Sequence, residues 1–89
     1  MMSTVDERAI EDVVLEILSM ELKEPAERIV QARSLKKELG MDSIAAANAI
    51  FTLEDRYGIE IELEEGDAVD SFRDIINVVR RALVRAPVA

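Results

Sequence analysis

The chain has 89 residues, which is the length of one domain with a modest core. Its 19 Asp and Glu residues outnumber its 11 Lys and Arg residues, and the net charge of -8 disfavours nucleic acids and anionic membrane surfaces as partners. The absence of Cys and His excludes a disulfide framework, a thiolate metal site and a cysteine nucleophile, and it removes the commonest general base.

No apolar run approaches the length of a membrane span. Residues 1–8 also lack the basic stretch followed by an apolar stretch that marks a signal peptide. We therefore expect a cytoplasmic protein.

A helical stripe of apolar residues predicts a first helix after Thr4, which forms a capping box with Glu7. The stripe consists of Ile10, Val13, Val14, Ile17 and Leu18. Pro25 ends this segment, because proline disfavours helix at the residue before it.

Residues 23–42 form a connection that is too long for a structureless loop in a compact domain. We expect one or two short helical turns here, ended by Gly40, with four side chains held on the core: Ile29, Val30, Leu35 and Leu39. Met20 and Met41 are expected to fill gaps in the packing, since methionine adapts to irregular space.

A second helix is predicted from about Ser43 to Tyr57, with Asp42 in a capping position and Gly58 as its stop. One face carries the residues expected in the core: Ala46, Ala49, Ile50, Leu53 and Tyr57. A neighbouring apolar face is expected to be exposed or half-exposed: Ile44, Ala47 and Phe51.

Alternating apolar and acidic residues at 59–64 predict an extended loop with every other side chain buried. A short helical turn is expected at Glu64 to Val69, and a last helix begins near Ser71, which forms a capping box with Asp74. The last helix has an apolar stripe of Phe72, Ile75, Ile76, Val79 and Leu83. The sequence thus predicts an all-α, up-and-down bundle of three main helices plus one short helix, in a single domain at residues 1–85 followed by a tail at 86–89.

The segment with the most chemical information is Gly40-Met41-Asp42-Ser43-Ile44, which opens the second helix. A serine at a helix start presents its hydroxyl to solvent, and the unpaired amides there favour an anion such as a phosphate attached to Ser43. Taken alone, the same residues are also typical of a plain helix cap.

The pattern Leu35-x-x-x-Leu39-Gly40-Met41-Asp42-Ser43-Ile44, followed by Leu53-Glu54-Asp55-Arg56-Tyr57-Gly58, resembles the acyl carrier protein family. The resemblance implies a four-helix bundle in which a separate phosphopantetheinyl transferase attaches 4′-phosphopantetheine from coenzyme A to Ser43, with Mg²⁺ helping. The arm's thiol would hold acyl, polyketide or aminoacyl intermediates as thioesters, so a protein without Cys could carry them. The chain would then be a carrier and not an enzyme, because no His is present to make Ser43 a hydrolytic nucleophile.

In this family Asp42 has two possible roles, as a helix cap or as a residue that helps the transferase position its metal and Ser43. The second helix is the family's usual partner-facing element, and many fatty-acid carriers have several acidic residues there. This chain has none between Ser43 and Glu54, so charge steering should be weak and apolar contact strong. We expect partner enzymes, namely the transferase and the loading and synthase enzymes of its pathway, to contact Met41, Ile44, Ala47, Asn48 and Phe51.

The lack of acidic residues between Ser43 and Glu54 on the second helix departs from the pattern of fatty-acid carriers. It favours a specialised pathway of polyketide, nonribosomal peptide or unusual lipid synthesis over housekeeping fatty-acid synthesis. The alternative is an unmodified helical interaction module that uses the face of Ile44, Ala47 and Phe51. The acidic loop at residues 60–70 lacks the calcium-loop pattern, so we expect a solvated acidic face and no metal site. The protein is expected to be a monomer.

Overall fold

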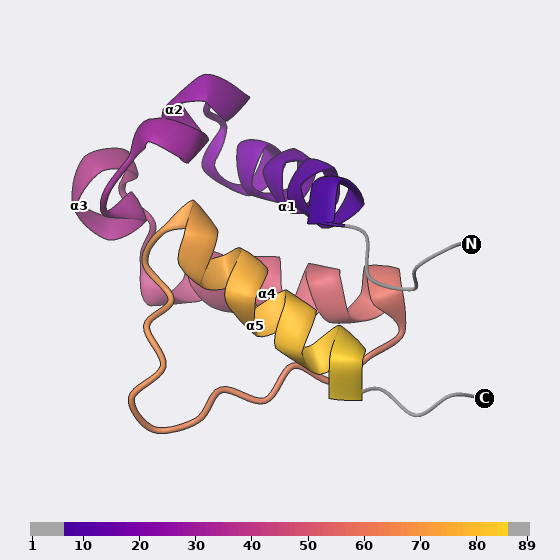
Figure 1. The fold of residues 1–89 in the computed structure, drawn as a ribbon. Coiled ribbons are helices and arrows are strands. Elements are labelled where there is room, and N and C mark those ends of the chain that lie inside the picture. Colours follow the sequence, from indigo (N-terminus) through magenta and orange to yellow (C-terminus); the bar gives the residue numbers. More distant parts are fainter. Residues whose placement is uncertain (1–6, 86–89) are drawn as a thin grey trace.

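The computed structural model describes residues 7–85 and is all-helical over that range (Figure 1). Its helices are α1 (Glu7–Leu22), α2 (Ala26–Gln31), α3 (Leu35–Leu39), α4 (Ser43–Tyr57) and α5 (Phe72–Arg85). Helix α1 contacts α2, α4 and α5, so the bundle is built around it. The all-α bundle of three main helices is confirmed. No helix among the described residues is long and apolar enough to cross a membrane.

The core is aliphatic and lies between the three long helices. Each helix contributes residues at helical spacing, and the fully buried ones include Ile10, Val14, Leu18, Leu53, Ile75, Ile76 and Val79. The short helices and the segment after them add Ile29, Leu35 and Met41. Because the apolar residues recur every three or four positions, each helix turns one continuous stripe inward.

The connection between α1 and α4 holds two short helices, as the sequence predicts. Ile29 of α2 and Leu35 of α3 are completely buried, and Leu39 packs half-buried against the core. Val30 was expected on the core but is 50% exposed, because it lies on the outer side of a helix of only six residues. A helix this short has too few turns for sequence periodicity to identify its inner face.

The loop between α4 and α5 contains no helical turn at residues 64–69, so that prediction is wrong. Asp67 closes a tight turn with Glu64 instead: its amide donates to the Glu64 carbonyl at 2.9 Å, and its carboxylate accepts from the Glu64 amide at 2.7 Å. Gly66, inside this turn, has a φ of 94°, which a right-handed helix does not use. The aspartate side chain thus competes with helix formation for the backbone donor.

In the extended segment before that turn, the predicted burial of every other side chain is found only in part. Ile61 is buried and Ile59 is half-buried, whereas Leu63 is exposed. The Glu54 side chain of α4 accepts a hydrogen bond from the Ile61 amide at 2.8 Å. This bond holds the segment along α4.

The start of α5 is the capping box that the sequence predicts. The Asp74 amide donates to Ser71 Oγ at 3.1 Å, and the Asp74 carboxylate accepts from the Ser71 amide at 3.1 Å. The predicted capping residue Thr4 and the predicted tail at 86–89 lie outside the described residues.

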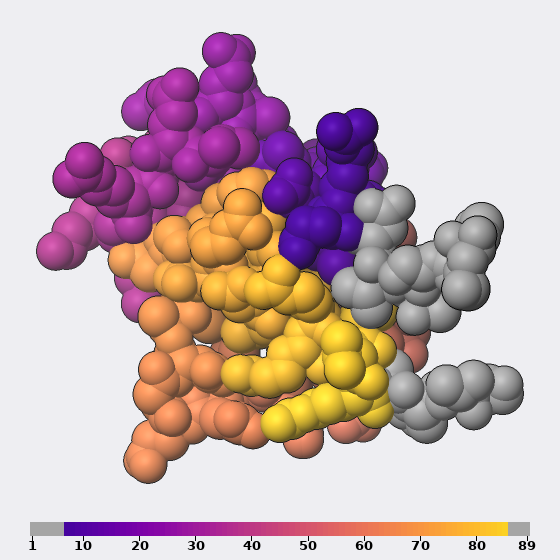
Figure 2. Space-filling view, in the orientation of Figure 1, coloured from indigo at the N-terminus to yellow at the C-terminus, as the bar shows by residue number. Residues whose placement is uncertain are grey.

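Charge is segregated along the sequence but is balanced in the fold. Arginines of α5 pair with acids of α1 and of the loop before α5, in the pairs Arg73–Glu11, Arg80–Glu7, Arg81–Asp67 and Arg85–Glu64. Figure 2 shows the loop lying along one side of α5. Residues 58–71 carry six carboxylates and no basic side chain, so these pairs offset part of their mutual repulsion.

Candidate functional site

The chain enters α4 through a segment that is fixed to the core. Gly40 ends α3 in the left-handed conformation, and the amides of Gly40 and Met41 both donate to the Leu35 carbonyl. The Met41 side chain is 1% exposed. It therefore fills a packing gap as expected, and because it offers almost no surface to solvent, its contact with a partner stays a prediction.

The second methionine expected in the packing behaves in the opposite way. Met20 is 73% exposed on α1, so the expectation that it fills a gap is wrong. It lies near the end of the helix, on the outer side of the stripe that contains Ile17.

Asp42 caps α4. Its backbone is extended, its Oδ1 accepts from the Ala45 amide at 2.8 Å, and its carbonyl accepts from the Ala46 amide at 2.9 Å. This geometry leaves Ser43 as the first residue of α4. Asp42 therefore fills the capping role that the sequence assigned to it, and its Oδ2 has no bonding partner among residues 7–85.

The Ser43 side chain is exposed, and its hydroxyl makes no hydrogen bond to any other described residue. The other serines of the described part are all at least partly buried. Ser34 Oγ donates to Asp70 and accepts from the Lys37 amide, while Ser71 Oγ accepts from the Asp74 amide. Ser43 is thus the serine in residues 7–85 whose hydroxyl is both exposed and uncommitted.

The surroundings of Ser43 suit a phosphodiester. The amides of Ser43 and Ile44 open the helix and have no hydrogen-bond partner among the described residues, so two donors at the positive end of α4 remain open although Asp42 already places a carboxylate there. An anion attached at Ser43 Oγ would lie beside that end. The Asp42 carboxylate would repel a phosphodiester attached to Ser43, because both are negatively charged. The positive end of the helix offsets part of that repulsion.

One face of α4 next to Ser43 is apolar and open. Ile44 is 70% exposed and Phe51 is 71% exposed, and Ala47 and Asn48 between them are also exposed. The Asn48 side chain donates to Glu21 of α1 at 3.3 Å. The exposure predicted for this face is confirmed. Its function in partner binding stays a prediction.

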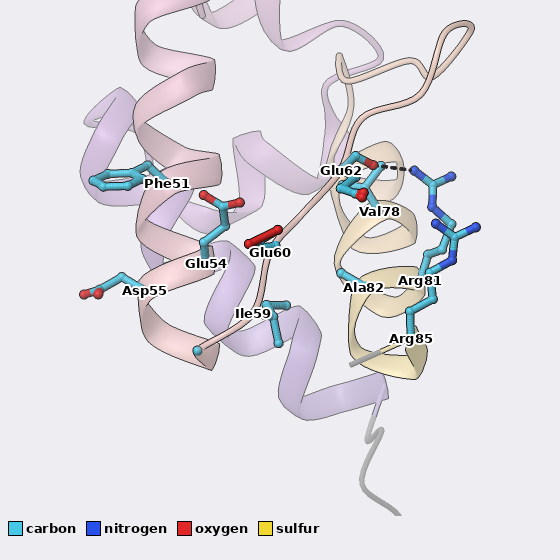
Figure 3. A pocket seen from close by; sticks show the side chains of 11 residues that line it. Phe51, Glu54, Asp55, Ile59, Glu60, Glu62, Val78, Arg81, Ala82 and Arg85 are labelled. Atoms are coloured by element: carbon cyan, nitrogen blue, oxygen red, sulfur yellow. Dashed lines mark hydrogen bonds between the residues drawn. The ribbon is translucent and has the colours of Figure 1, made fainter. Parts of the chain in front are cut away.

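A groove of about 890 Å³ lies farther along the molecule, between the second half of α4, the segment that follows it, and α5 (Figure 3). The groove is lined by Ile59, Val78 and Ala82 and by charged side chains such as those of Glu54 and Arg81. The lining begins at Phe51, eight residues from Ser43 and about 12 Å along the helix. Ser43 itself is outside the groove, on the open end of the helix.

Two aspartates of the loop before α5 are held in the ionised form. Hydrogen bonding by the Arg81 guanidinium lowers the pKa of Asp67 to about 2. Hydrogen bonding by the Ser34 hydroxyl, and then by the Lys36 amide, lowers the pKa of Asp70 below its usual value. The sequence did not predict the contact of Asp67 with Arg81 or that of Asp70 with Ser34. These partners are 14 and 36 residues apart, and no local pattern pairs them.

The structure thus places one exposed, unbonded serine hydroxyl at the start of a helix, within an all-α bundle over residues 7–85. The family model described as a phosphopantetheine attachment site matches residues 12–79. No solved structure gave a significant match.

Similar proteins include an acyl carrier protein of Streptomyces coelicolor, 34% identical over 76 residues, which are 84% of this chain and 83% of that protein. Acyl carrier protein 3 of Ralstonia nicotianae is 28% identical over 72 residues, covering 81% of this chain and 83% of that protein. A mitochondrial acyl carrier protein of Dictyostelium discoideum is 31% identical over 78 residues, or 88% of this chain and 64% of that protein.

The chain belongs to the acyl carrier protein family of phosphopantetheine-binding proteins. It is therefore a carrier without catalytic activity of its own, and its cofactor is covalently attached 4′-phosphopantetheine. The arm supplies the thiol that the sequence lacks.

Proposed function

We propose that Ser43 is the residue to which 4′-phosphopantetheine is attached. The observation that carries this proposal is the hydroxyl of Ser43, which is exposed and unbonded at the positive end of α4, while the hydroxyls of Ser34 and Ser71 are used as caps. Asp42 fixes this helix start without covering the serine.

In this reaction the carrier supplies the attacking oxygen. A bond forms between Ser43 Oγ and the phosphorus that bears the pantetheine in coenzyme A, and the diphosphate P–O bond to that phosphorus breaks. The nucleotide leaves with the bridging oxygen, and the serine proton passes to a base of the transferase or to solvent. No His is present in the chain, and we assign the general base to the transferase.

The test is to incubate the protein with coenzyme A, Mg²⁺ and a broad-specificity phosphopantetheinyl transferase and then to measure its intact mass. We expect a gain of one phosphopantetheine in the wild type and in the matched control Ser19→Ala, whose hydroxyl is half-buried in α1. Ser43→Ala should gain nothing. A gain that persists in Ser43→Ala would contradict the assignment.

The variant Ser43→Ala also distinguishes a carrier protein from the alternative, an unmodified interaction module. If the partners bind Ser43→Ala as they bind the wild type and the wild type takes up no arm, the function lies in the face of Ile44, Ala47 and Phe51 alone. If Ser43→Ala cannot be loaded with a thioester, the carrier function is supported.

For the partners, we propose that the transferase and the loading and synthase enzymes contact the α4 face of Ile44, Ala47, Asn48 and Phe51. This face has no carboxylate before Glu54, and Glu54 is itself bonded to the Ile61 amide. An apolar face of this kind favours contact over long-range steering, which supports a dedicated carrier of a polyketide, nonribosomal peptide or unusual lipid pathway. We also propose that the carrier works as a monomer in the cytoplasm.

A further inference from the structure

Helix α3 is too short to be stable by itself and is held by residues outside it. It spans only Leu35–Leu39, and an isolated helix of five residues is far below the length that is marginally stable in water. Its position therefore depends on the side chains that satisfy its first amides.

Asp70, 34 or more residues away in sequence, supplies two of those acceptors. Its carbonyl accepts from the Leu35 amide at 2.6 Å, and its Oδ1 accepts from the Lys36 amide at 2.9 Å. Its Oδ2 accepts from Ser34 Oγ at 2.6 Å, and the same Ser34 oxygen accepts from the Lys37 amide at 3.1 Å. Three consecutive amides at the start of α3 are thus satisfied by Asp70 directly or through Ser34.

Asp70 is itself fixed by the start of α5. Its amide donates to the Asp74 carboxylate at 3.1 Å, in the same capping box that opens α5. The connection continues on the other side of α3, where the Leu35 carbonyl accepts from the amides of Gly40 and Met41. Met41 leads directly to Asp42 and Ser43, so hydrogen bonds run without a break from α5 to the segment that presents the serine.

We propose that Asp70 is a positioning residue for phosphopantetheinylation: by capping α3 it sets the place of residues 40–42 and hence the presentation of Ser43 to the transferase. The inference rests on the proposed attachment at Ser43. Asp70 does not contact Ser43, so its effect is on the fraction of molecules in which the segment is correctly placed. A lower competent fraction raises the apparent KM in proportion and leaves kcat unchanged.

The test compares Asp70→Asn with Asp67→Asn. Both changes remove one negative charge from the same loop, but the hydrogen bonds of the Asp67 carboxylate go to Arg81 and Glu64 and not to α3. Asp70 accepts through both carboxylate oxygens, and Asn has only one acceptor oxygen, so Asp70→Asn loses one of the two contacts. We expect it to raise the KM of the transferase for the carrier about tenfold, equivalent to about 1.4 kcal/mol, with kcat within about twofold of the wild type. Asp67→Asn should leave both constants unchanged.

Amide hydrogen exchange provides a second measurement that does not depend on the transferase. In Asp70→Asn the amides of Lys36, Lys37 and Met41 should exchange faster than in the wild type, and in Asp67→Asn they should not. If Asp70→Asn does not fold, Ser34→Ala removes the hydroxyl from the same contact and should shift KM and exchange in the same direction.

An unchanged KM in Asp70→Asn, or equal rises in Asp70→Asn and Asp67→Asn, would overturn the inference. A fall in kcat with KM unchanged would also overturn it, because that result points to the chemical step. Failure of the attachment proposal is distinguishable, since it would appear first as a wild type that gains no arm or as a gain that survives Ser43→Ala.

Discussion

The guanidinium of Arg81 donates to both carboxylate oxygens of Asp67, at 2.6 and 3.2 Å, and to the carbonyl oxygen of Glu62 at 3.1 Å. One side chain of α5 thus holds the loop before it at two points. The dashed line in Figure 3 marks the bond to Glu62.

This contact predicts an acid-sensitive fold. Hydrogen bonding by Arg81 lowers the pKa of Asp67 to about 2, from its ordinary value of 3.8. A carboxylate with a depressed folded-state pKa stabilises the protein above its unfolded pKa, and that contribution is lost as the pH falls through the folded value. We therefore expect the urea midpoint to fall between about pH 4 and about pH 2, and the lowered pKa of Asp70 acts in the same direction. Asp67→Asn should show a smaller loss over the same window, and an identical pH dependence would contradict this account.

A pair of substitutions at Asp42 separates its two possible roles. Asp42→Ala should cost about 1 kcal/mol of unfolding free energy, because the Ala45 amide loses its acceptor. Asp42→Asn should cost only a few tenths, since the amide oxygen caps nearly as well. We expect Asp42→Asn nevertheless to slow transfer of the arm, measured as transferase kcat/KM at saturating Mg²⁺. A normal rate in Asp42→Asn would assign Asp42 to capping alone.

The two methionines give opposite predictions. Met41→Ala should destabilise the protein by about 2–5 kcal/mol, because it leaves a cavity under the segment that presents Ser43. Met20→Ala should change stability by less than about 0.5 kcal/mol, since its side chain is mostly in solvent. Chemical denaturation of both variants checks the contrast, and comparable losses would show that Met41 is not buried as described.

The apolar face of α4 predicts partner contacts that salt does not weaken. Phe51→Asp should leave the unfolding free energy within about 0.5 kcal/mol of the wild type, because the ring is exposed. It should also lower the affinity for the partner enzymes. Val84→Asp on α5 is the matched control, since it places the same charge on another exposed apolar residue. Titration of the holo protein with a partner enzyme at low and high ionic strength measures the affinity and its salt dependence, and chemical denaturation measures the unfolding free energy. Equal losses of affinity in the two variants would show that this face does not take part in recognition.

Where a helix is long and its apolar pattern repeats several times, the sequence alone predicts its bounds and its faces. It predicts α4 with its bounds, its caps Asp42 and Gly58, and the exposed face of Ile44 and Phe51, because a 15-residue helix repeats its pattern often enough to define two faces. The presentation of Ser43 at its first position follows from the same pattern.

Elsewhere the outcome depends on contacts between distant residues. The Met41 side chain points into the core because the amides of Gly40 and Met41 donate to the Leu35 carbonyl. The turn from Glu64 to Asp67 is closed by the Asp67 carboxylate, to which Arg81 also donates. The link from Ser34 to Asp70 joins residues that no local rule connects. Tertiary hydrogen bonds of this kind cannot be read from spacing.

Under the proposed attachment at Ser43, burial of Met41 one residue before the cap ties the attachment point of the arm to the core of the bundle. The distance over which a cargo can travel between two enzymes is then set by the length of the tether and by tumbling of the carrier as a rigid particle. A partner that needs a longer reach would have to reposition the entire carrier.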